Sequence, residues 1–233
     1  GRAAVLRRLG EALRDMPEIF TGTARPGQIF DVLRHATVRA GADGALRRVP
    51  IERIGASHVL RALLKAFATV WPGGQSLGNK PVGDVWFHPH AGGDSADAQR
   101  VPLHGKAQWL VYSMVEPLSA AGLQVDRLDE LTAIPEYRHG GLLIDAGVIV
   151  PRHPDVARQV YTPGDRWVVE WRALTVTLLD EVVRLVRGEL NEPGWTLGKV
   201  LEGGSWAAGR EIAAELRPGG PPPVRVAGEG TLL

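Results

Sequence analysis

The stretch 167–190, WVVEWRALTVTLLDEVVRLVRGEL, carries the longest helical periodicity in the chain. Apolar residues recur along it at intervals of three and four, which is the spacing of one face of an α-helix. The members of this apolar face are Trp167, Trp171, Leu174, Leu178, Val182 and Leu185. Charged residues fall on the other side. The stretch therefore predicts a long amphipathic helix whose apolar face packs against the core.

Two earlier stretches have the same character. An apolar stripe at residues 59–70 runs into WPGG at 71–74, a sequence that ends helices. A second stripe covers residues 107–118. Within it, Pro117 is expected to end or kink the helix, because proline lacks the N–H that a helix interior uses. Both stretches are predicted to be core helices.

These helices predict a mainly α protein, with a single helical domain over residues 1–233 and at most a minor β element. The chain has 233 residues, 44% of them apolar, which is enough to bury one sizeable core. Residues 73–102 are rich in Gly, Pro, Asp and His and lack sustained periodicity. That composition predicts a long loop between the first two helices.

Composition also limits the partners. The chain has 27 Lys plus Arg against 26 Asp plus Glu, so no excess of positive charge favours a nucleic-acid backbone. It has no cysteine, which excludes disulfides, thiolate metal sites and thiol catalysis. No apolar run reaches the roughly 18 residues of a membrane helix, and the N-terminus lacks a secretory apolar block. We expect a cytoplasmic protein that binds neither nucleic acid nor membrane.

The densest run of chemically versatile side chains is PEYRHGG at residues 135–141. It places a carboxylate, a phenol, a guanidinium and an imidazole directly before an apolar run, where charges need partners. A site is one interpretation, in which Glu136, Arg138, Asp145, Glu170 and Arg172 converge on one pocket. The alternative is a buried structural ion pair of Arg138 with Glu170 or Asp145.

A second polar set lies along one helical face, at Lys199, Glu202, Trp206 and Arg210. Residues 203–204 are two glycines inside this helix, which cost about 2 kcal/mol relative to alanine. Close approach of another helix or of a ligand would compensate for that cost. A solvated surface is the alternative interpretation of this face.

The tryptophans Trp109, Trp171 and Trp206 are candidates for stacking on a planar base. Core packing is the more frequent role of such residues.

A metal site is the rival chemistry. Nitrogen and oxygen ligands occur within one short stretch, at Asp84, His88, His90, Asp94 and His104. The spacing matches no zinc motif, because His88-Pro-His90 does not put both imidazoles on one helical face. We therefore predict no metal and no cofactor.

Several short motifs together resemble a family of uracil-catabolism proteins, the Urc-four or Urg-three type. They are VPLH (101–104), QWL (108–110), EPL (116–118), LT (131–132), EYRHGG (136–141), DAGV (145–148), VEWRALT (169–175), LEGG (201–204) and WAAGR (206–210). The matches run from about residue 25 to the C-terminus. Members of that family are longer at the N-terminus, so the resemblance implies that an N-terminal part is missing here. It also implies a role in uracil or pyrimidine catabolism.

A more distant resemblance is to the queuosine-salvage N-glycosidases. The shared pieces, in the same order, are KAQ (106–108), EYR (136–138), GV (147–148), GDR (164–166) and VEWR (169–172). In those proteins a carboxylate before Tyr-Arg and a lysine on the earlier helix form the functional pair, which carries over to Glu136 and Lys106. Two departures are that Glu136 replaces an aspartate and that Gly105 stands where the uracil family usually has lysine.

These resemblances imply an N-ribosyl hydrolase that acts on a ribosylurea or related ribotide. Cleavage of a C1′–N bond passes through an oxocarbenium-like state, which a carboxylate stabilises while it orients the attacking water. The predicted catalytic residues are Glu136, Lys106 and Tyr137. The predicted substrate-binding residues are His104, Gln108, Trp109, Arg138, His139, Asp145, Glu170, Arg172, Glu202, Trp206 and Arg210. Among them Arg138, Arg172 and Arg210 suit a 5′-phosphate.

Two other functions remain as alternatives. One is a non-catalytic ligand-binding or complex-forming partner of other enzymes of uracil degradation. The other is phosphoribosyl transfer to uracil, which needs an acidic diphosphate-sugar motif at a strand end that the sequence lacks.

Overall fold

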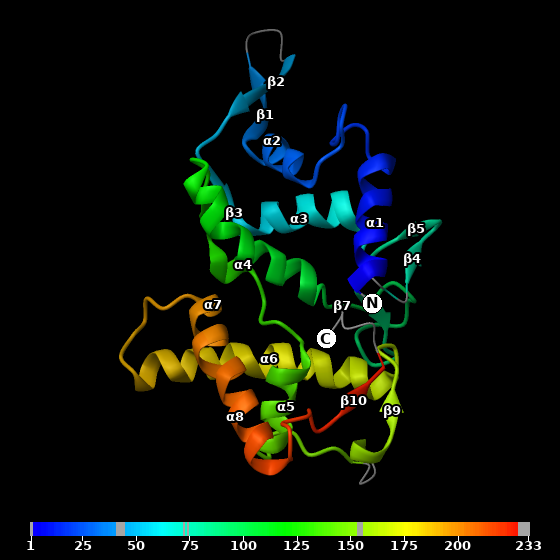
Figure 1. Ribbon diagram of the computed structural model, residues 1–233, viewed down its shortest axis with the longest axis vertical. Helices are drawn as coiled ribbons and strands as arrows, with labels where there is room; N and C mark the ends of the chain where they lie inside the picture. Colours follow the sequence, from blue (N-terminus) through cyan, green and yellow to red (C-terminus); the bar gives the residue numbers. More distant parts are fainter. Residues whose placement is uncertain (1, 41–44, 72, 74, 153–155, 228–233) are drawn as a thin grey trace.

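Helix α6 (Arg166–Glu189) crosses the lower half of the molecule and organises the helices around it (Figure 1). The computed structural model describes residues 2–40, 45–71, 73, 75–152 and 156–227. Helices account for about 51% of the chain and the sheets are small, so the predicted mainly α class is confirmed.

The upper half of the molecule contains the N-terminal helices (Figure 1). These are α1 (Arg2–Asp15), the 3₁₀ turn η1 (Pro26–Gln28), α2 (Ile29–Leu33), α3 (Ala56–Phe67) and α4 (Gly105–Ala120). They share one apolar cluster, centred on Val59, Leu63 and Val111, none of which is exposed. The 3₁₀ turn η2 (Leu128–Glu130) contacts α3 at the edge of this half.

The lower half contains the remaining helices (Figure 1). They are α5 (Tyr137–Asp145), η3 (Val156–Arg158), α6, α7 (Leu197–Val200), the π-helical turn η4 (Leu201–Trp206) and α8 (Ala207–Leu216). Two smaller apolar clusters hold them together, one around Leu179 and one around Trp171. The core is thus divided among three clusters, and the single domain of the whole chain stays a prediction.

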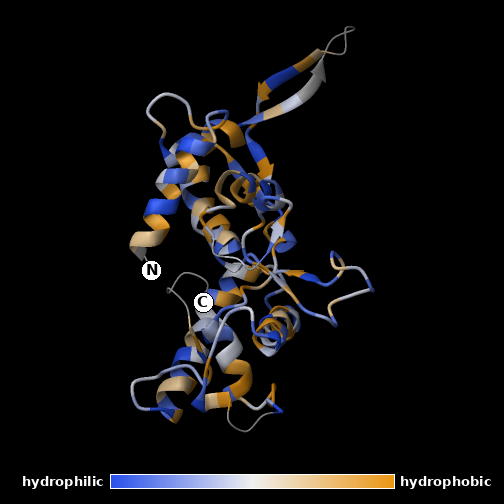
Figure 2. Ribbon diagram, turned by 90° about the vertical axis from the view of Figure 1, so that its right-hand side faces the viewer, coloured by the Kyte–Doolittle hydropathy of each residue, from blue (hydrophilic) through white to orange (hydrophobic). Residues whose placement is uncertain are grey.

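The strands form two-stranded ladders only, within the described residues. The ladders are β1 (His35–Ala40) with β2 (Ala45–Pro50), β4 (Ser76–Leu77) with β5 (Lys80–Pro81), β6 (Val85–Phe87) with β7 (Arg100–Pro102), and the parallel pairs β3 (Arg53–Gly55) with β8 (Gln124–Asp126) and β9 (Val160–Tyr161) with β10 (Arg225–Val226). The β1–β2 hairpin extends away from the helices (Figure 2). The segment expected to be a long loop therefore contains two short antiparallel pairs, β4–β5 and β6–β7.

Helix α3 ends earlier than expected, whereas α4 ends close to its proline. Helix α3 ends at Phe67, before the predicted stop at 71–74, of which Pro72 and Gly74 lie outside the described residues. Helix α4 continues through Pro117 to Ala120. Pro117 lies in the last turn of α4, so the helix ends within about one turn of the proline.

The buried face of α6 differs from the predicted one. Leu174 and Leu185 are 42% and 48% exposed. The buried positions of the helix are Val168, Val169, Trp171, Arg172, Thr175, Leu179 and Val183. The prediction from hydrophobicity is confirmed for Trp171, which is buried, and for Trp167, which packs beside it. It was wrong for Leu174 and Leu185, because the buried face includes Arg172 and Thr175 instead. Because two residues of this buried face are polar, a pattern based on apolar residues alone does not identify it.

No helix among the described residues combines the length and the apolar character needed to cross a bilayer.

The contact between α5 and α8 depends on Gly209. A Cβ built on this residue would lie 2.3 Å from the carbonyl oxygen of Arg138, which belongs to the backbone of α5. We predict that Gly209→Ala lowers the free energy of unfolding by about 1–3 kcal/mol, because the two helices must separate. Urea denaturation measures this change.

The matched control is Gly10→Ala in the interior of α1, where a Cβ meets nothing within 4 Å. It should raise stability by up to about 1 kcal/mol through helix propensity. Equal effects of the two substitutions would contradict the close approach at Gly209.

Candidate functional site

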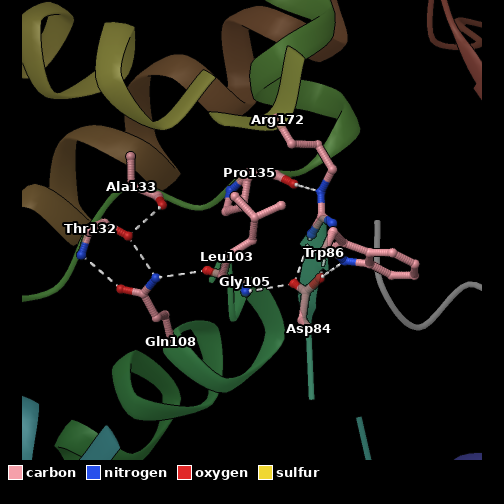
Figure 3. A network of polar contacts seen from close by, with 9 residues as sticks. All are labelled: Asp84, Trp86, Leu103, Gly105, Gln108, Thr132, Ala133, Pro135 and Arg172. Atoms are coloured by element: carbon pink, nitrogen blue, oxygen red, sulfur yellow. Dashed lines mark hydrogen bonds and ion pairs between the residues drawn. The ribbon is translucent and has the colours of Figure 1, made fainter. Parts of the chain in front are cut away.

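Asp84 is a buried carboxylate at the centre of a polar network with Arg172, Trp86 and Gly105 (Figure 3). Its Oδ1 accepts hydrogen bonds from Arg172 Nη1 at 2.9 Å and from Trp86 Nε1 at 2.7 Å. Its Oδ2 accepts from Arg172 Nη2 at 2.8 Å and from the Gly105 N–H at 3.2 Å. The Gly105 N–H is at the start of α4, where the helix dipole favours a negative charge. Both oxygens of Asp84 are therefore fully engaged.

Arg172 is the largest fully buried side chain, at 1% exposure. Besides its two bonds to Asp84, its Nε donates to the carbonyl of Pro135 at 3.2 Å. A buried guanidinium is tolerated because its donors are satisfied by a carboxylate and a carbonyl. The ion pair consequently connects α6, the start of α4, and the segment that leads into α5 (Figure 3).

Gln108 on α4 holds the same segment from the other side (Figure 3). Its Nε2 donates to Thr132 Oγ1 at 2.6 Å and to the Leu103 carbonyl at 3.2 Å, and its Oε1 accepts from the Thr132 N–H at 2.7 Å. The carboxamide of Gln108, predicted to bind substrate, is thus used within the fold. It positions the segment 131–135 against α4.

Glu136 follows that segment and is the N-cap of α5. Its Oε1 accepts the backbone N–H of His139 at 2.8 Å, and its side chain is 12% exposed. Within the described residues no hydrogen bond reaches Oε2 of Glu136. The cap fixes the carboxylate while one oxygen stays available.

Lys106, in the first turn of α4, interacts electrostatically with Glu136, Arg172 and Asp84. Burial lowers the pKa of its ammonium from 10.5, Glu136 raises it, Arg172 lowers it and Asp84 raises it. Lys106 and Glu136 are 30 residues apart in sequence and interact through their charges. Among the described residues no hydrogen bond or ion pair within 4.0 Å joins them. We call Lys106, Glu136, Asp84 and Arg172 the junction cluster.

Two histidines adjoin the junction cluster. His104 is the N-cap residue of α4, in a left-handed conformation with φ of 47°. Burial lowers the pKa of His104, and Asp84 opposes that shift. The Nδ1 of His104 is buried and has no hydrogen-bond partner in the described part of the chain. The ring of His139 contacts the Ile134 carbonyl through Nδ1 at 3.0 Å, while its buried Nε2 has no hydrogen-bond partner among the residues that the structure describes.

The other predicted charges do not converge on this cluster. Asp145 pairs with Arg217, with Nη1 and Oδ1 2.8 Å apart. Glu170 has a 60% exposed side chain and lies 3.9 Å from Nε2 of His88. The prediction that these charges converge on one pocket is therefore wrong. The alternative, an ion pair of Arg138 with Glu170 or Asp145, is not formed either. The turn at 217–221 and the β6–β7 pair bring these partners from distant parts of the chain.

The remaining predicted residues lie mostly at the surface. Tyr137 packs against the Trp171 cluster, and the guanidinium of Arg138 lies 4.7 Å from its ring centroid. Arg210 lies in the same way over Trp206, at 4.9 Å. Trp109 and Trp206 are 56% and 37% exposed, so both indoles are accessible for stacking. Glu202 is exposed on the π-helical turn η4.

The candidate metal ligands are not assembled. Asp84 binds Arg172, and the rings of His88 and His90 contact each other edge to face at 5.7 Å between centroids. Among the described residues no group of three or more His, Asp and Glu side chains is placed to hold a metal ion.

The structure gives Asp84, expected only as a possible metal ligand, a different role, and it adds Arg217 to the residues considered. Asp84 is the partner of Arg172, and Arg217 is the partner of Asp145. A sequence signal existed for Asp84, since it lies within the otherwise apolar VGDVWF at 82–87. A carboxylate in such a run indicates a buried charge that needs an arginine. Arg217, before a Pro-Gly turn, has no comparable signal.

Fold and site together define a mainly helical protein with a partly buried lysine–carboxylate cluster at the junction of its two halves. The sequence profile of the family described as "Protein of unknown function (DUF1688)" matches residues 1–233. The chain belongs to this family.

Two curated relatives are similar over the whole chain. One is Uracil catabolism protein 4 of Lachancea kluyveri, 33% identical, of which the chain covers 56%. The other is Protein urg3 of Schizosaccharomyces pombe, also 33% identical, of which it covers 53%. The chain thus spans about half the length of the curated relatives it matches. No solved structure matches it.

We predict that Arg172→Leu lowers the free energy of unfolding by about 3–5 kcal/mol, because it leaves Asp84 buried without its counter-charge. The control is Arg184→Leu, which breaks a pair with Glu181 whose side chains are 67% and 54% exposed. That control should cost no more than about 1 kcal/mol. Denaturant titration compares the two, and similar losses would show that the buried pair does not hold the junction.

Lys106 should make stability depend on pH. Because burial lowers its pKa in the folded state, the unfolded chain binds more protons between that pKa and 10.5, and stability rises with pH in this window. Lys106→Met should remove this rise and increase the melting temperature near pH 7. The control is Lys65→Met at an exposed position of α3. A lower melting temperature for Lys106→Met would mean that attraction to Glu136 and Asp84 outweighs burial.

Proposed function

We propose that the protein acts in uracil catabolism as an N-ribosyl hydrolase that cleaves the C1′–N bond of a ribosylurea or related ribotide. The similarity to Uracil catabolism protein 4 supports the pathway. The resemblance of residues 106–108, 136–138 and 169–172 to queuosine-salvage N-glycosidases supports the reaction. The observation that carries the proposal is the partly buried carboxylate of Glu136, which is held through Oε1 by the His139 N–H and whose Oε2 accepts no hydrogen bond among the described residues. Its charge also acts on Lys106.

The chemistry needs an anion beside the sugar and a proton donor beside the leaving nitrogen. In the proposed step a water oxygen bonds to C1′ as the C1′–N bond breaks. Oε2 of Glu136 orients the water, takes its proton and stabilises the developing positive charge. Lys106 gives a proton to the leaving nitrogen, and the lowered pKa of its ammonium makes it a stronger acid than an exposed lysine.

The rigidity of the junction supports this division of labour. Arg172 and Gln108 hold the segment before Glu136 through the Pro135 carbonyl and Thr132. Gly105, at the position where the uracil family usually has lysine, packs against the same segment. A Cβ on Gly105 would lie 3.2 Å from Cδ of Pro135, so a longer side chain there is crowded. Lys106 is therefore the lysine that the proposal assigns to proton donation.

Tyr137 has a smaller part in the proposal than the sequence suggested. Its ring packs against the Trp171 cluster beside Arg138. We assign it to positioning α5 rather than to proton transfer. Trp109, three residues after Lys106 on α4 and exposed, is the indole we propose to stack on the base or ureido group.

Glu136→Gln tests the reaction. Glutamine keeps an oxygen that can accept the His139 N–H, so the α5 cap and the melting temperature should be retained. Turnover should fall by about a hundredfold or more, while ligand affinity is kept, because one transition-state electrostatic contact is lost. The assay incubates the protein with a panel of ribosides and ribotides and measures released ribose or ribose phosphate.

Glu189→Gln, at an exposed position near the end of α6, is the control and should leave turnover unchanged. Wild-type turnover in Glu136→Gln would sink the proposed role of this carboxylate. Ligand binding without any turnover by the wild type would favour the alternative of a non-catalytic ligand-binding partner.

A further inference from the structure

A pocket of about 490 Å³ opens between α5 and α8. Arg138 of α5, Arg210 and Glu211 of α8, and the turn at Gly219 and Gly220 line it. Its size is that of pockets that hold small molecules. We call it the arginine pocket. Within the described residues it does not include any member of the junction cluster.

Both arginines of this pocket are held without a carboxylate. The Arg138 Nη1 donates to the Gly220 carbonyl at 3.2 Å, and its guanidinium lies over Tyr137. The guanidinium of Arg210 lies over Trp206. No ion pair within 4.0 Å reaches either one among the described residues, whereas Arg172 and Arg217 of the same half each bind an aspartate.

The positioning contacts leave donors unused. A guanidinium has five N–H donors, and a ring contact through its face consumes none of them. Arg210 makes no hydrogen bond within the described part of the chain, and Arg138 makes one. Two oriented cations with free donors on one pocket form a site for an oxyanion, because the guanidinium fork matches its oxygens.

The turn on the other side of the pocket is built from glycine for a backbone reason. Gly219 and Gly220 have φ of 80° and 64°, the left-handed region that side chains rarely adopt. The turn is anchored by Arg217, whose Nε donates to the Pro221 carbonyl at 2.7 Å and whose Nη1 binds Asp145. On this side the pocket is thus lined by the backbone of Gly219 and Gly220 without side chains, which leaves room for a ligand.

We propose that the arginine pocket binds the phosphate group of a small phosphorylated molecule. Glu211 also lines the pocket and makes no ion pair with either arginine, so its charge opposes the anion and limits the affinity. The two arginines and Glu211 together give the pocket a net charge of +1. A charge of this size favours a single phosphate group over a polyphosphate. This proposal is linked to the proposed function only because a ribotide carries such a phosphate group. Phosphate binding in this pocket does not require that the protein hydrolyse its ligand.

Isothermal titration calorimetry on the full chain tests this with ribose 5-phosphate, inorganic phosphate and unphosphorylated ribose. Ribose 5-phosphate should bind, ribose should not, and affinity should fall as salt is added. Binding of inorganic phosphate as tight as that of the sugar phosphate would identify free phosphate as the ligand. Tighter binding of the sugar phosphate would identify a phosphate monoester. Binding of ribose as tight as ribose 5-phosphate overturns the proposal.

Charge-changing variants locate the binding in the pocket. Arg210→Gln, at an exposed position, should weaken ribose 5-phosphate binding by about tenfold or more, since it removes charged hydrogen bonds. Glu211→Gln should strengthen it. The control Arg184→Gln, on the exposed face of α6, should leave it unchanged.

Unaltered affinity in both Arg210→Gln and Glu211→Gln overturns the proposal, as does the absence of any binding to the wild type. These outcomes are separate from the hydrolase assay. Loss of turnover in Glu136→Gln with intact ribose 5-phosphate binding would leave the arginine pocket standing, and the reverse result would leave the hydrolase standing.

Discussion

The buried ion pair between Arg172 and Asp84 is the interaction on which the arrangement of the two halves depends. A guanidinium at 1% exposure pays a large desolvation penalty, which only a fully satisfied partner offsets. Asp84 supplies two parallel hydrogen bonds and shares its remaining capacity with Trp86 and the start of α4. The relative positions of α6, β6 with Asp84, the start of α4 and the segment before α5 are therefore fixed together. A shift of any one of them would leave a buried charge without its partner.

This constraint explains why the candidate chemistry lies where it does. Glu136 follows Pro135 directly, and the carbonyl of Pro135 is held by Arg172. Lys106 follows Gly105 directly, and the N–H of Gly105 is held by Asp84. The carboxylate and the lysine are thus each one residue away from an anchor on the same ion pair. Fixed positions of this kind reduce the reorganisation that a transition state requires.

The same half of the molecule uses arginine in two different ways. Arg172 and Arg217 are consumed by aspartates and act as structural connections. The guanidinium groups of Arg138 and Arg210 lie over aromatic rings instead, and both residues line the arginine pocket. The sequence does not distinguish these two uses of arginine, because a motif shows the type of a residue and not its partner in the fold. Of the three arginines that suited a phosphate by motif, only Arg138 and Arg210 keep that capacity in the fold.

The sequence by itself determined the mainly helical class and the place of α6. Helical periodicity is a local property, so it is visible in a window of one or two dozen residues. The tertiary structure alone decided which face of α6 is buried, which carboxylate meets which arginine, and that Asp145 and Glu170 lie apart from the junction cluster. Such pairings join residues up to 88 positions apart, as Asp84 and Arg172 do. They depend on the desolvation of charges in the assembled core, which no local pattern records.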